Sequence, residues 1–318
     1  MSAIFLTEAE VERLVTMSDA IAAVEQAFRQ LGSGGAENVP RVRTHAPGIV
    51  LHSMSAAAGY LGLVGGKNYT TTRTGARFLV GLYPAESGEL AALIEADRLG
   101  QLRTGAATAV AVSCLADPLA SEVGLFGTGH QAETQLEAVA SVRSIKQAFV
   151  YGRDAERRVN FAEQMSKRLN LDVQPVDRPQ EAAEDLRIVI TATNSREPVF
   201  DGRDLAEGAL VCAVGSNWLN RAEIDTHVIR RADNIVCDSI KACQNEAGDF
   251  VESLEKGNFD WSRAVELSDV LLGRATGRNN SQSVVLFKSV GLAIEDVALG
   301  AVVLERAKQQ GIGVALPF

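Results

Sequence analysis

Apolar and polar residues follow helical spacing at the start of this 318-residue chain and strand-like spacing after it. A capping-box pattern at residues 7–10 predicts a first helix. A second predicted helix follows Ser18-Asp19, and its apolar face is formed by Ile21, Val24, Phe28 and Leu31. Short apolar runs separated by turn signals then predict strands at 39–46, 49–54, 60–71, 76–83 and 90–95. This part is therefore expected to be α+β and mainly antiparallel.

From residue 103 onward the pattern changes to alternating helices and short apolar strands. An alanine-rich helix is predicted at 104–115, and a last helix at 291–309. Between them, strands are predicted at 122–126, 147–151, 188–191, 210–214 and 234–237, with helices at 131–141, 155–169 and 224–231. Such alternation is typical of an α/β fold with a doubly wound parallel sheet.

Composition excludes several classes of partner. The chain is 46% hydrophobic and 22% charged, as in ordinary globular proteins, and its net charge of -9 argues against nucleic acid and anionic membranes. The N-terminal residues do not resemble a signal peptide and no long apolar run is present, so we expect a cytoplasmic protein. The four cysteines form no CxxC pair and the four histidines are scattered, which argues against a metal site and favours reduced, mostly buried thiols.

A glycine-rich loop follows the predicted strand at 122–126. Residues 127–132 read Gly-Thr-Gly-His-Gln-Ala, a GxGxxA pattern between a strand and a helix. The first glycine allows a tight turn, the second lets the backbone approach a pyrophosphate, and the helix N-terminus attracts phosphate charge. We therefore expect nicotinamide dinucleotide binding by Gly127, Thr128, Gly129, His130 and Gln131.

The residues after the next strand bear on the choice between NAD and NADP. Gly152 stands where an acid would bind the ribose of NAD. Arg153 can pair with the 2′-phosphate of NADP, and Asp154 is explained as the N-cap of the following helix. The sequence therefore favours NADP(H), with Gly152 and Arg153 as cofactor contacts, and leaves NAD(H) open.

Five separated segments resemble the ornithine cyclodeaminase/mu-crystallin family. They are Val39-Pro40-Arg41, Gly65-Gly66-Lys67, Leu-Arg-Thr-Gly-Ala-Ala at 102–107, the 127–132 loop, and Phe-Lys-Ser-Val-Gly at 287–291 with Glu295-Asp296. The segments occur in the family's order, so the resemblance covers nearly the whole chain.

The resemblance implies both the architecture and the cofactor contacts. It implies a Rossmann domain at residues 116–290, inserted in an α+β domain of residues 1–115 and 291–318 that binds substrate and dimerises. A homodimer formed through the α+β domain is expected. Further implied cofactor contacts are Thr191, Thr193, Asn194, Val214, Gly215, Ser289, Val290 and Gly291.

The resemblance also implies a substrate site with three cations. Arg41, Lys67 and Arg103 match the residues that bind the substrate carboxylate in the family. Converging cations suit a small anionic substrate, and arginine offers bidentate geometry. Arg43 lies on the same strand face as Arg41 and is the alternative to it. Lys67 is expected to donate a proton to the reacting nitrogen or to guide it, with a pKa lowered by the arginines.

One substrate position departs from the ornithine cyclodeaminases. They carry an aspartate that handles the substrate's side-chain amine, where this chain has Asn217. An amide neither takes up a proton nor neutralises a second ammonium group. We therefore expect an NAD(P)-dependent oxidoreductase that reduces a ketimine or cyclic imino acid to an amino acid, or oxidises the amino acid. A cyclodeaminase that recycles bound NAD and a non-catalytic dinucleotide-binding protein are the alternatives.

Overall fold

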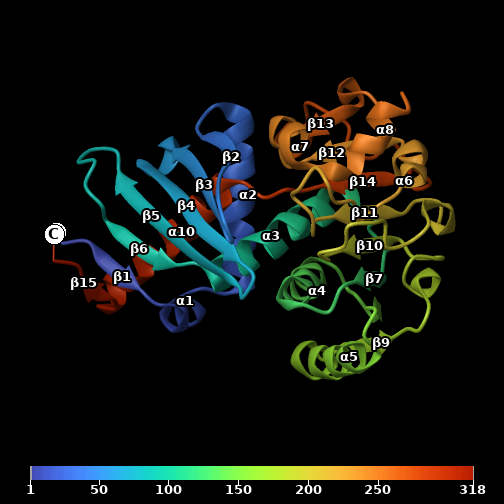
Figure 1. Cartoon of the computed structure of the whole chain (residues 1–318), viewed down its shortest axis with the longest axis horizontal. Coiled ribbons are helices and arrows are strands. Elements are labelled where there is room, and N and C mark those ends of the chain that lie inside the picture. The colour runs from blue at the N-terminus through green and yellow to red at the C-terminus, as the bar shows by residue number, and fades with distance from the viewer. Residues whose placement is uncertain (1, 318) are drawn as a thin grey trace. The chain divides into compact units, whose positions relative to one another are not determined.

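A computed structural model describes residues 2–317, and the chain divides into two compact units. The first unit contains the residues up to Ala106 and those from Gly291 onward, and the second contains Ala107–Val290. In Figure 1 each unit is built around a sheet with helices against it. The division falls inside α3 (Asp97–Leu115), whereas the predicted boundary follows residue 115. The second half of α3 is held in the second unit by Arg143, whose Nη2 donates to the carbonyls of Val112 and Ser113 at 2.8 and 3.0 Å.

The first unit contains a seven-stranded sheet in the order β15-β1-β6-β5-β4-β3-β2. Its strands pair antiparallel, except that β1 runs parallel to β6. The strands are β1 (Ile4–Leu6), β2 (Glu37–Ala46), β3 (Ile49–Ala58), β4 (Leu63–Thr72), β5 (Ala76–Pro84), β6 (Ala92–Glu95) and β15 (Val314–Ala315). The helices are α1 (Glu8–Leu14), α2 (Met17–Ser33), the 3₁₀ turn η1 (Gly59–Leu61) and α10 (Ala293–Gln310). The sequence predicted the long antiparallel strands and missed the short β1 and β15.

Helix α10 packs on one face of this sheet and against α2. Alternate side chains of β3 and β4 are buried on that face, among them Met54, Lys67 and Tyr69. Residues between them, such as Leu51 and Val64, remain exposed on the opposite face. The sheet therefore has one covered and one open face, as its alternating pattern predicts.

A bulge in β2 sets which of its side chains face α10. Val39 pairs with Ser55 and Val42 with Ser53, so one extra residue lies between them. Val39 and Val42 are exposed on the open face, whereas Arg41 is buried and Arg43 half-buried on the covered face. The bulge thus allows both arginines to point inward while Val39, two residues before Arg41, points outward.

Helix α2 starts earlier than the sequence predicted. Thr16 is its N-cap, and Thr16 and Asp19 form a capping box that replaces the predicted start after Ser18-Asp19. Val24 and Phe28 are buried as predicted, but Ile21 and Leu31 are half-buried. Ala20, Ala23 and Ala27 are buried in addition to Val24 and Phe28, and their small side chains allow α2 to pack closely against α10.

The second unit contains an eight-stranded, all-parallel sheet in the order β13-β12-β14-β11-β10-β7-β8-β9. The predicted doubly wound α/β fold is confirmed. Its strands are β7 (Glu122–Phe126), β8 (Gln147–Tyr151), β9 (Asp172–Pro175), β10 (Ile188–Thr191), β11 (Leu210–Ala213), β12 (Asn234–Cys237), β13 (Ala264–Glu266) and β14 (Val285–Lys288). Its main helices are α4 (His130–Val142), α5 (Ala155–Leu169), α6 (Thr226–Arg231), α7 (Ile240–Glu246), α8 (Val251–Glu255) and α9 (Leu267–Leu271). Short 3₁₀ turns are η2 (Pro179–Ala182), η3 (Gly202–Asp204), η4 (Gly248–Phe250) and η5 (Trp261–Arg263).

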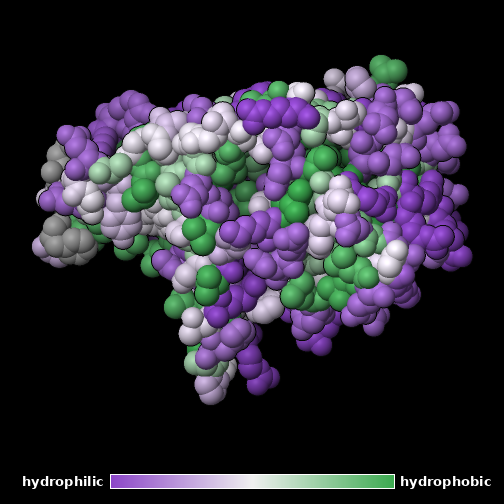
Figure 2. All heavy atoms as spheres, turned by 90° about the horizontal axis from the view of Figure 1, so that it is seen from above, coloured by the Kyte–Doolittle hydropathy of each residue, from purple (hydrophilic) through white to green (hydrophobic). Residues whose placement is uncertain are grey.

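The surface drawn in Figure 2 is mainly hydrophilic, with hydrophobic residues in scattered patches. No helix within residues 2–317 is both long enough and apolar enough to cross a membrane. Cys212, Cys237 and Cys243 are buried, as expected for thiols of a folded core, whereas Cys114 is exposed.

Candidate functional site

A buried group of charged residues lies in the first unit. Arg41 comes from β2, Lys67 from β4 and Arg103 from α3, and their exposed fractions are 8%, 3% and 7%. Glu295 and Asp296, both from the first turn of α10, are fully buried beside them. The structure therefore brings together the three predicted cations and adds two acids. We call these five residues the cationic cluster.

Asp296 joins two of the cations through one oxygen. Its Oδ1 accepts from Lys67 Nζ at 3.0 Å and from Arg103 Nε at 3.2 Å. Arg103 Nη1 donates to Glu295 Oε2 at 2.9 Å. Asp296 Oδ2 is buried without a hydrogen-bond partner among the described residues. The two acids thus fix the directions of the lysine and of one arginine.

Two glycines let the backbone approach these cations. Gly291 has a φ of 81°, and a Cβ there would lie 2.5 Å from Arg103 Nη1. The Gly291 carbonyl also lies 3.5 Å from Arg41 Nη2. A Cβ at Gly100 would lie 2.8 Å from Lys67 Nζ. Any larger residue at either position would displace a cation.

Aromatic rings and a thioether support the cations from the sheet. Arg41 Nε lies 3.3 Å from Met54 Sδ, and its guanidinium lies 6.0 Å from the centre of the Tyr69 ring. Lys67 Nζ lies 5.9 Å from the centre of the same ring and 5.2 Å from that of Phe78. Tyr69 stacks on His52 with the ring centres 4.1 Å apart. These rings interact with the charges through their electron-rich faces and hold the cations in place.

The electrostatics of the cationic cluster favour proton exchange at Lys67. Burial, together with Arg103 and Arg41, lowers the pKa of Lys67 to about 8, although Asp296 opposes the change. Burial is also the main reason why the pKa of His52 falls to about 4, and Arg43 and Arg41 lower it further. Lys67 can therefore hold or release a proton near neutral pH, whereas His52 is neutral there.

The glycine-rich loop lies in the second unit, between β7 and α4. Gly127 has a φ of 117°, and a Cβ there would lie 2.4 Å from the Ala192 carbonyl oxygen. Gly129 is the N-cap of α4, and a Cβ there would meet nothing within 4 Å. Ala132 is fully buried where α4 packs on the sheet. The loop has the open helix N-terminus that a pyrophosphate needs.

A hollow of about 340 Å³ lies beyond the ends of β8 and β10. It is lined by Arg153, Asn194, Ser195, Arg196 and Glu197. Asp154 caps α5 and accepts from the Arg157 amide at 3.0 Å, as the sequence predicted. Two arginines therefore face a space next to the strand end where a dinucleotide's ribose is selected.

The other predicted cofactor residues of the second unit lie at the carboxyl ends of neighbouring strands. Thr191 ends β10 and Thr193 follows it, Val214 and Gly215 follow β11, and Ser289 and Val290 follow β14. Asn217 lies in the same unit, after β11, and Gly291 belongs to the first unit. Within the described residues, the buried hydroxyls of Thr191 and Ser216 have no partner. Orphaned polar atoms at this edge fit a bound polar ligand.

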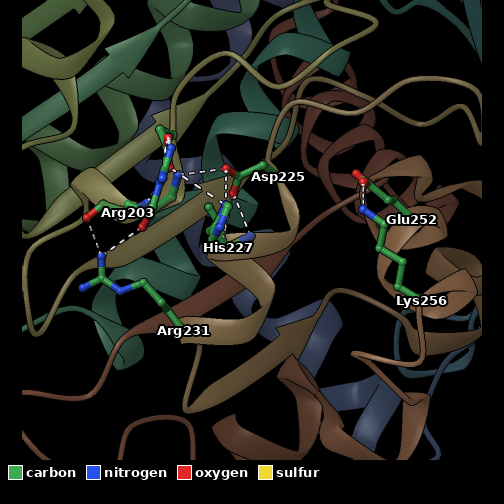
Figure 3. Close-up of polar contacts among 9 residues, drawn as sticks. Arg203, Asp225, His227, Arg231, Glu252 and Lys256 are labelled. Atoms are coloured by element: carbon green, nitrogen blue, oxygen red, sulfur yellow. Dashed lines mark hydrogen bonds and ion pairs between the residues drawn. The ribbon is translucent and has the colours of Figure 1, made fainter.

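One group of side chains has the spacing of metal ligands but is occupied by helix capping. Atoms of Asp201, Asp225 and His227 lie within 4.8 Å of one another. Asp225 accepts backbone amides from Gly202, His227 and Val228, and Asp201 pairs with Arg203 (Figure 3). The carboxylates are thus used as N-caps of α6 and η3.

Comparison with known proteins identifies the family of this chain. Residues 1–311 match the ornithine cyclodeaminase/mu-crystallin family. The chain belongs to this family.

Family members with assigned activities are similar over nearly the whole length. A Delta(1)-pyrroline-2-carboxylate reductase of Bacillus cereus is 30% identical, over 97% of this chain and 98% of its own. The structure of Thermococcus litoralis Delta(1)-pyrroline-2-carboxylate reductase with NADH and L-proline is 31% identical, covers 98% of this chain and 100% of its own, and has a TM-score of 0.94. An archaeal alanine dehydrogenase dimer with bound NAD is 29% identical, covers 100% of both chains, and also has a TM-score of 0.94. The prediction of an NAD(P)-dependent oxidoreductase that acts on C=N bonds is confirmed.

In this member of the ornithine cyclodeaminase/mu-crystallin family, the sequence alone does not indicate the role of the two acids of the cationic cluster. Glu295 and Asp296 are separated from Arg103 and Lys67 by 192 and 229 residues along the chain, so no local pattern links them. One signal was available, because two adjacent acids interrupt the otherwise apolar start of α10. Acids in such a position are buried only when they are paired.

Proposed function

We propose that the substrate is a cyclic imino acid of the pyrroline-2-carboxylate type, which the enzyme reduces to the amino acid with NAD(P)H. The observation that carries the proposal is the cationic cluster, in which two arginines and a lysine of lowered pKa lie together. Pyrroline-2-carboxylate carries one carboxylate next to an imine, so a carboxylate clamp beside a proton donor suits it. The two reductases described above also act on this compound according to their names.

In the proposed reaction each residue of the cationic cluster has a distinct task. Arg103 uses Nε and Nη1 to bind the two acids, and its Nη2 would receive the substrate carboxylate together with Arg41. Lys67 Nζ would hold the proton that goes to the imine nitrogen. The nicotinamide dinucleotide supplies the hydride that reduces the imine carbon. Fixed cations orient the substrate for transfer at low entropic cost.

Substitution of Arg103 tests the carboxylate clamp. Arg103→Ala is expected to raise the KM for the imino acid about 100-fold or more, because a buried charged partner is lost, and to leave dinucleotide affinity unchanged. Arg103→Lys keeps the charge for Glu295 and Asp296 but loses the bidentate fork, and should raise the KM less. Arg98→Ala, on the same helix, is the control. Equal loss of affinity for imino acid and dinucleotide would show that Arg103 is only structural.

The activity itself is measured as oxidation of NADH or NADPH in the presence of pyrroline-2-carboxylate or piperideine-2-carboxylate. Oxidation that requires the imine supports the proposal. Asn217 disfavours substrates with a second ammonium group, so ornithine should release no ammonia. Ammonia release from ornithine without net oxidation of the cofactor would instead favour a cyclodeaminase.

We also propose that the enzyme prefers NADP(H). The proposal rests on Arg153 and Arg196, both of which line the hollow beyond β8 and β10, and on Gly152 in the position of a ribose-binding acid. Arg153→Ala should raise the KM for NADPH about tenfold and change that for NADH little, because a charge-assisted bond to the 2′-phosphate is lost. Arg157→Ala on α5 is the control. An unchanged ratio of the two KM values would contradict the 2′-phosphate role.

A homodimer formed through the open face of the first unit's sheet is proposed as the assembly. Large apolar residues of β2, β3, β4 and β5 are exposed on this face, opposite the face on which α10 packs. They are Val39, Val42, Ile49, Leu51, Val64, Leu79 and Tyr83. An apolar patch of this kind marks a protein interface, and an archaeal family member of known structure is a dimer.

A further inference from the structure

A second set of buried charges lies in the second unit and takes no part in the proposed transfer. Glu223 and Lys288 are fully buried and Asp249 is 3% exposed. Lys288 ends β14, Glu223 lies between β11 and α6, and Asp249 lies in η4. Strands β14, β11 and β10 are neighbours in the sheet, so these charges lie near three adjacent strand ends. Buried charges of this kind cost free energy unless they are paired and hydrogen-bonded.

The Glu223 carboxylate joins the loops that follow β10 and β11. Its Oε1 accepts from the amide and the hydroxyl of Thr193, both at 2.7 Å. Its Oε2 accepts from the amides of Gly215 and Ser216 at 2.6 and 3.1 Å. Three of the four donors are backbone N–H groups, which cannot accept, so both oxygens must act as acceptors. Only the ionised carboxylate satisfies this arrangement fully.

Lys288 and Asp249 hold Glu223 and its loops from behind. Lys288 Nζ donates to the Ser216 carbonyl at 2.8 Å and lies 2.7 Å from Asp249 Oδ2. Asp249 Oδ1 accepts from the Glu223 amide at 2.7 Å. Burial, together with the negative charge of Asp249, raises the pKa of Glu223, and the charge of Lys288 and the bonds from Thr193 oppose that rise. Lys288 and Thr193 favour the charged form of Glu223, and the network connects the ends of β10, β11 and β14.

The two loops lie where the nicotinamide half of a dinucleotide belongs. In a doubly wound sheet the dinucleotide crosses the strand ends at the switch point, here between β7 and β10. With the pyrophosphate at the 127–129 loop, the adenosine half extends toward β8 and the nicotinamide half toward β10 and β11. The orphaned hydroxyls of Thr191 and Ser216 lie in these two loops.

We propose that Glu223 is a positioning residue for the nicotinamide, because its carboxylate holds the 191–193 and 214–216 loops together as one cradle. The inference rests on the dinucleotide dependence of the proposed function and extends it to a named residue. Gly215 supports it, since a Cβ there would lie 2.3 Å from the Thr193 amide nitrogen and 2.5 Å from Glu223 Oε1. The two loops thus approach each other more closely than any side chain at position 215 allows.

The test compares two ligands that differ only in the nicotinamide group. Dissociation constants of NADH and ADP-ribose are measured by calorimetry for the wild type and for Glu223→Gln, and NADPH and 2′-phospho-ADP-ribose are measured in parallel. The glutamine places an N–H₂ group against N–H donors and so forces the loops apart. We expect affinity for the reduced dinucleotide to fall about tenfold or more, while that for the nicotinamide-free ligand changes less than about threefold.

Two further variants complete the test, one as a control and one as a second way to separate the two loops. Asp225→Asn is the matched control, because this carboxylate also accepts backbone amides in the same unit, as Figure 3 shows, but caps α6. It should lower the melting temperature without changing the affinity ratio. Gly215→Ala spreads the same two loops and should reproduce the selective loss if Glu223→Gln does not fold.

Equal weakening of both ligands, or no weakening, would overturn the inference. Its failure is distinguishable from failure of the proposed function, since the ligands are measured without any imino acid. A wild type that binds NADH but reduces no imino acid would contradict only the substrate proposal.

Discussion

Asp296 has two tasks. It holds Lys67 and Arg103 in place, and its charge raises the pKa of Lys67. It is a fully buried carboxylate, and one oxygen contacts both the lysine and an arginine of the cationic cluster. Because the lysine is attracted by this acid and repelled by Arg103 and Arg41, its pKa reflects the balance between them. The second oxygen, which has no partner among the described residues, lies beside the same charges.

Asp296→Asn should therefore move the pH dependence of the reaction. The proposed reaction uses protonated Lys67, so activity is expected to be highest below the pKa of about 8 and to fall as the pH rises through it. The amide removes the charge that raises the pKa of Lys67, so the fall should occur at lower pH in the variant. The measurement is kcat/KM for the imino acid between pH 6 and pH 10, a range spanning about two units on either side of that pKa.

Glu295→Gln is the control for this prediction, since Glu295 pairs with Arg103 whereas Lys67 pairs with Asp296. Its profile should stay close to that of the wild type. If Asp296→Asn lowered activity equally at every pH, Lys67 would not be the group whose titration limits the reaction.

At the scale of elements, short apolar runs predicted most strands of the second unit. Strands β7, β8, β10 and β12 have the predicted bounds, because short runs of buried apolar residues are bounded by polar turns. Strand β9 was missed, since Val173 is its only buried residue. Strand β14 was missed although it is central, because the buried Lys288 gives its end a polar appearance.

The candidate site, too, could be predicted from the sequence only in part. The glycine-rich loop is one contiguous segment, and its backbone geometry is set by residues that are neighbours in the sequence, so the pattern alone predicted it. The partners of the cations come from a helix about two hundred residues away, and only the fold brings them together.

Helix α2 is joined to α10 by a charged contact that includes its own cap. Arg306 Nη1 and Nη2 donate to the two oxygens of Asp19 at 2.7 and 2.6 Å, and Nη1 also donates to the Leu14 carbonyl. The contact with Arg306, followed by that with Thr16, lowers the pKa of Asp19 to about 2. One carboxylate thus connects the start of α2 with the end of the chain's last helix.

Asp19→Asn should reduce the free energy of unfolding by about 1 kcal/mol at neutral pH. The lowered pKa means that the stabilisation is present above about pH 4 and is lost as the pH falls toward 2. Urea unfolding of wild type and variant at pH 7 and near pH 3 should therefore give a smaller difference at the lower pH. Glu25→Gln, which breaks an exposed pair on the same helix, should have little effect at either pH. A difference that does not shrink would show that the cap is stabilising without its charge.

At the scale of the whole molecule, the proposed homodimer rests on the apolar residues exposed on the open face of the first unit's sheet. Its exposed residues include Val42 at 60% and Leu51 at 41%, on two paired strands. Covering such a face with a second copy removes apolar area from water, which is the main driving force of stable association.

Val42→Asp combined with Leu51→Asp should convert the proposed dimer to a monomer, because two charges would be buried without partners at the interface. The molar mass is measured by size-exclusion chromatography with light scattering. Val159→Asp, at an exposed apolar position of α5 in the second unit, is the control and should leave the mass unchanged. A monomeric wild type would contradict the proposal directly.

The bulge of β2 has a consequence for the contact between this strand and α10. Before the bulge, Asn38 Oδ1 accepts the Ile294 amide at the start of α10, and after it Arg41 and Arg43 face the same side. In a β2 of the same length without the bulge, side chains would alternate without interruption, so that Arg41 and Arg43 facing inward would turn Asn38 outward and Val39 inward. The helix that carries Glu295 and Asp296 would lose a capping acceptor, although neither acid was altered. The irregular pairing at this point of the strand is therefore as much a determinant of the site as the identity of its charged residues.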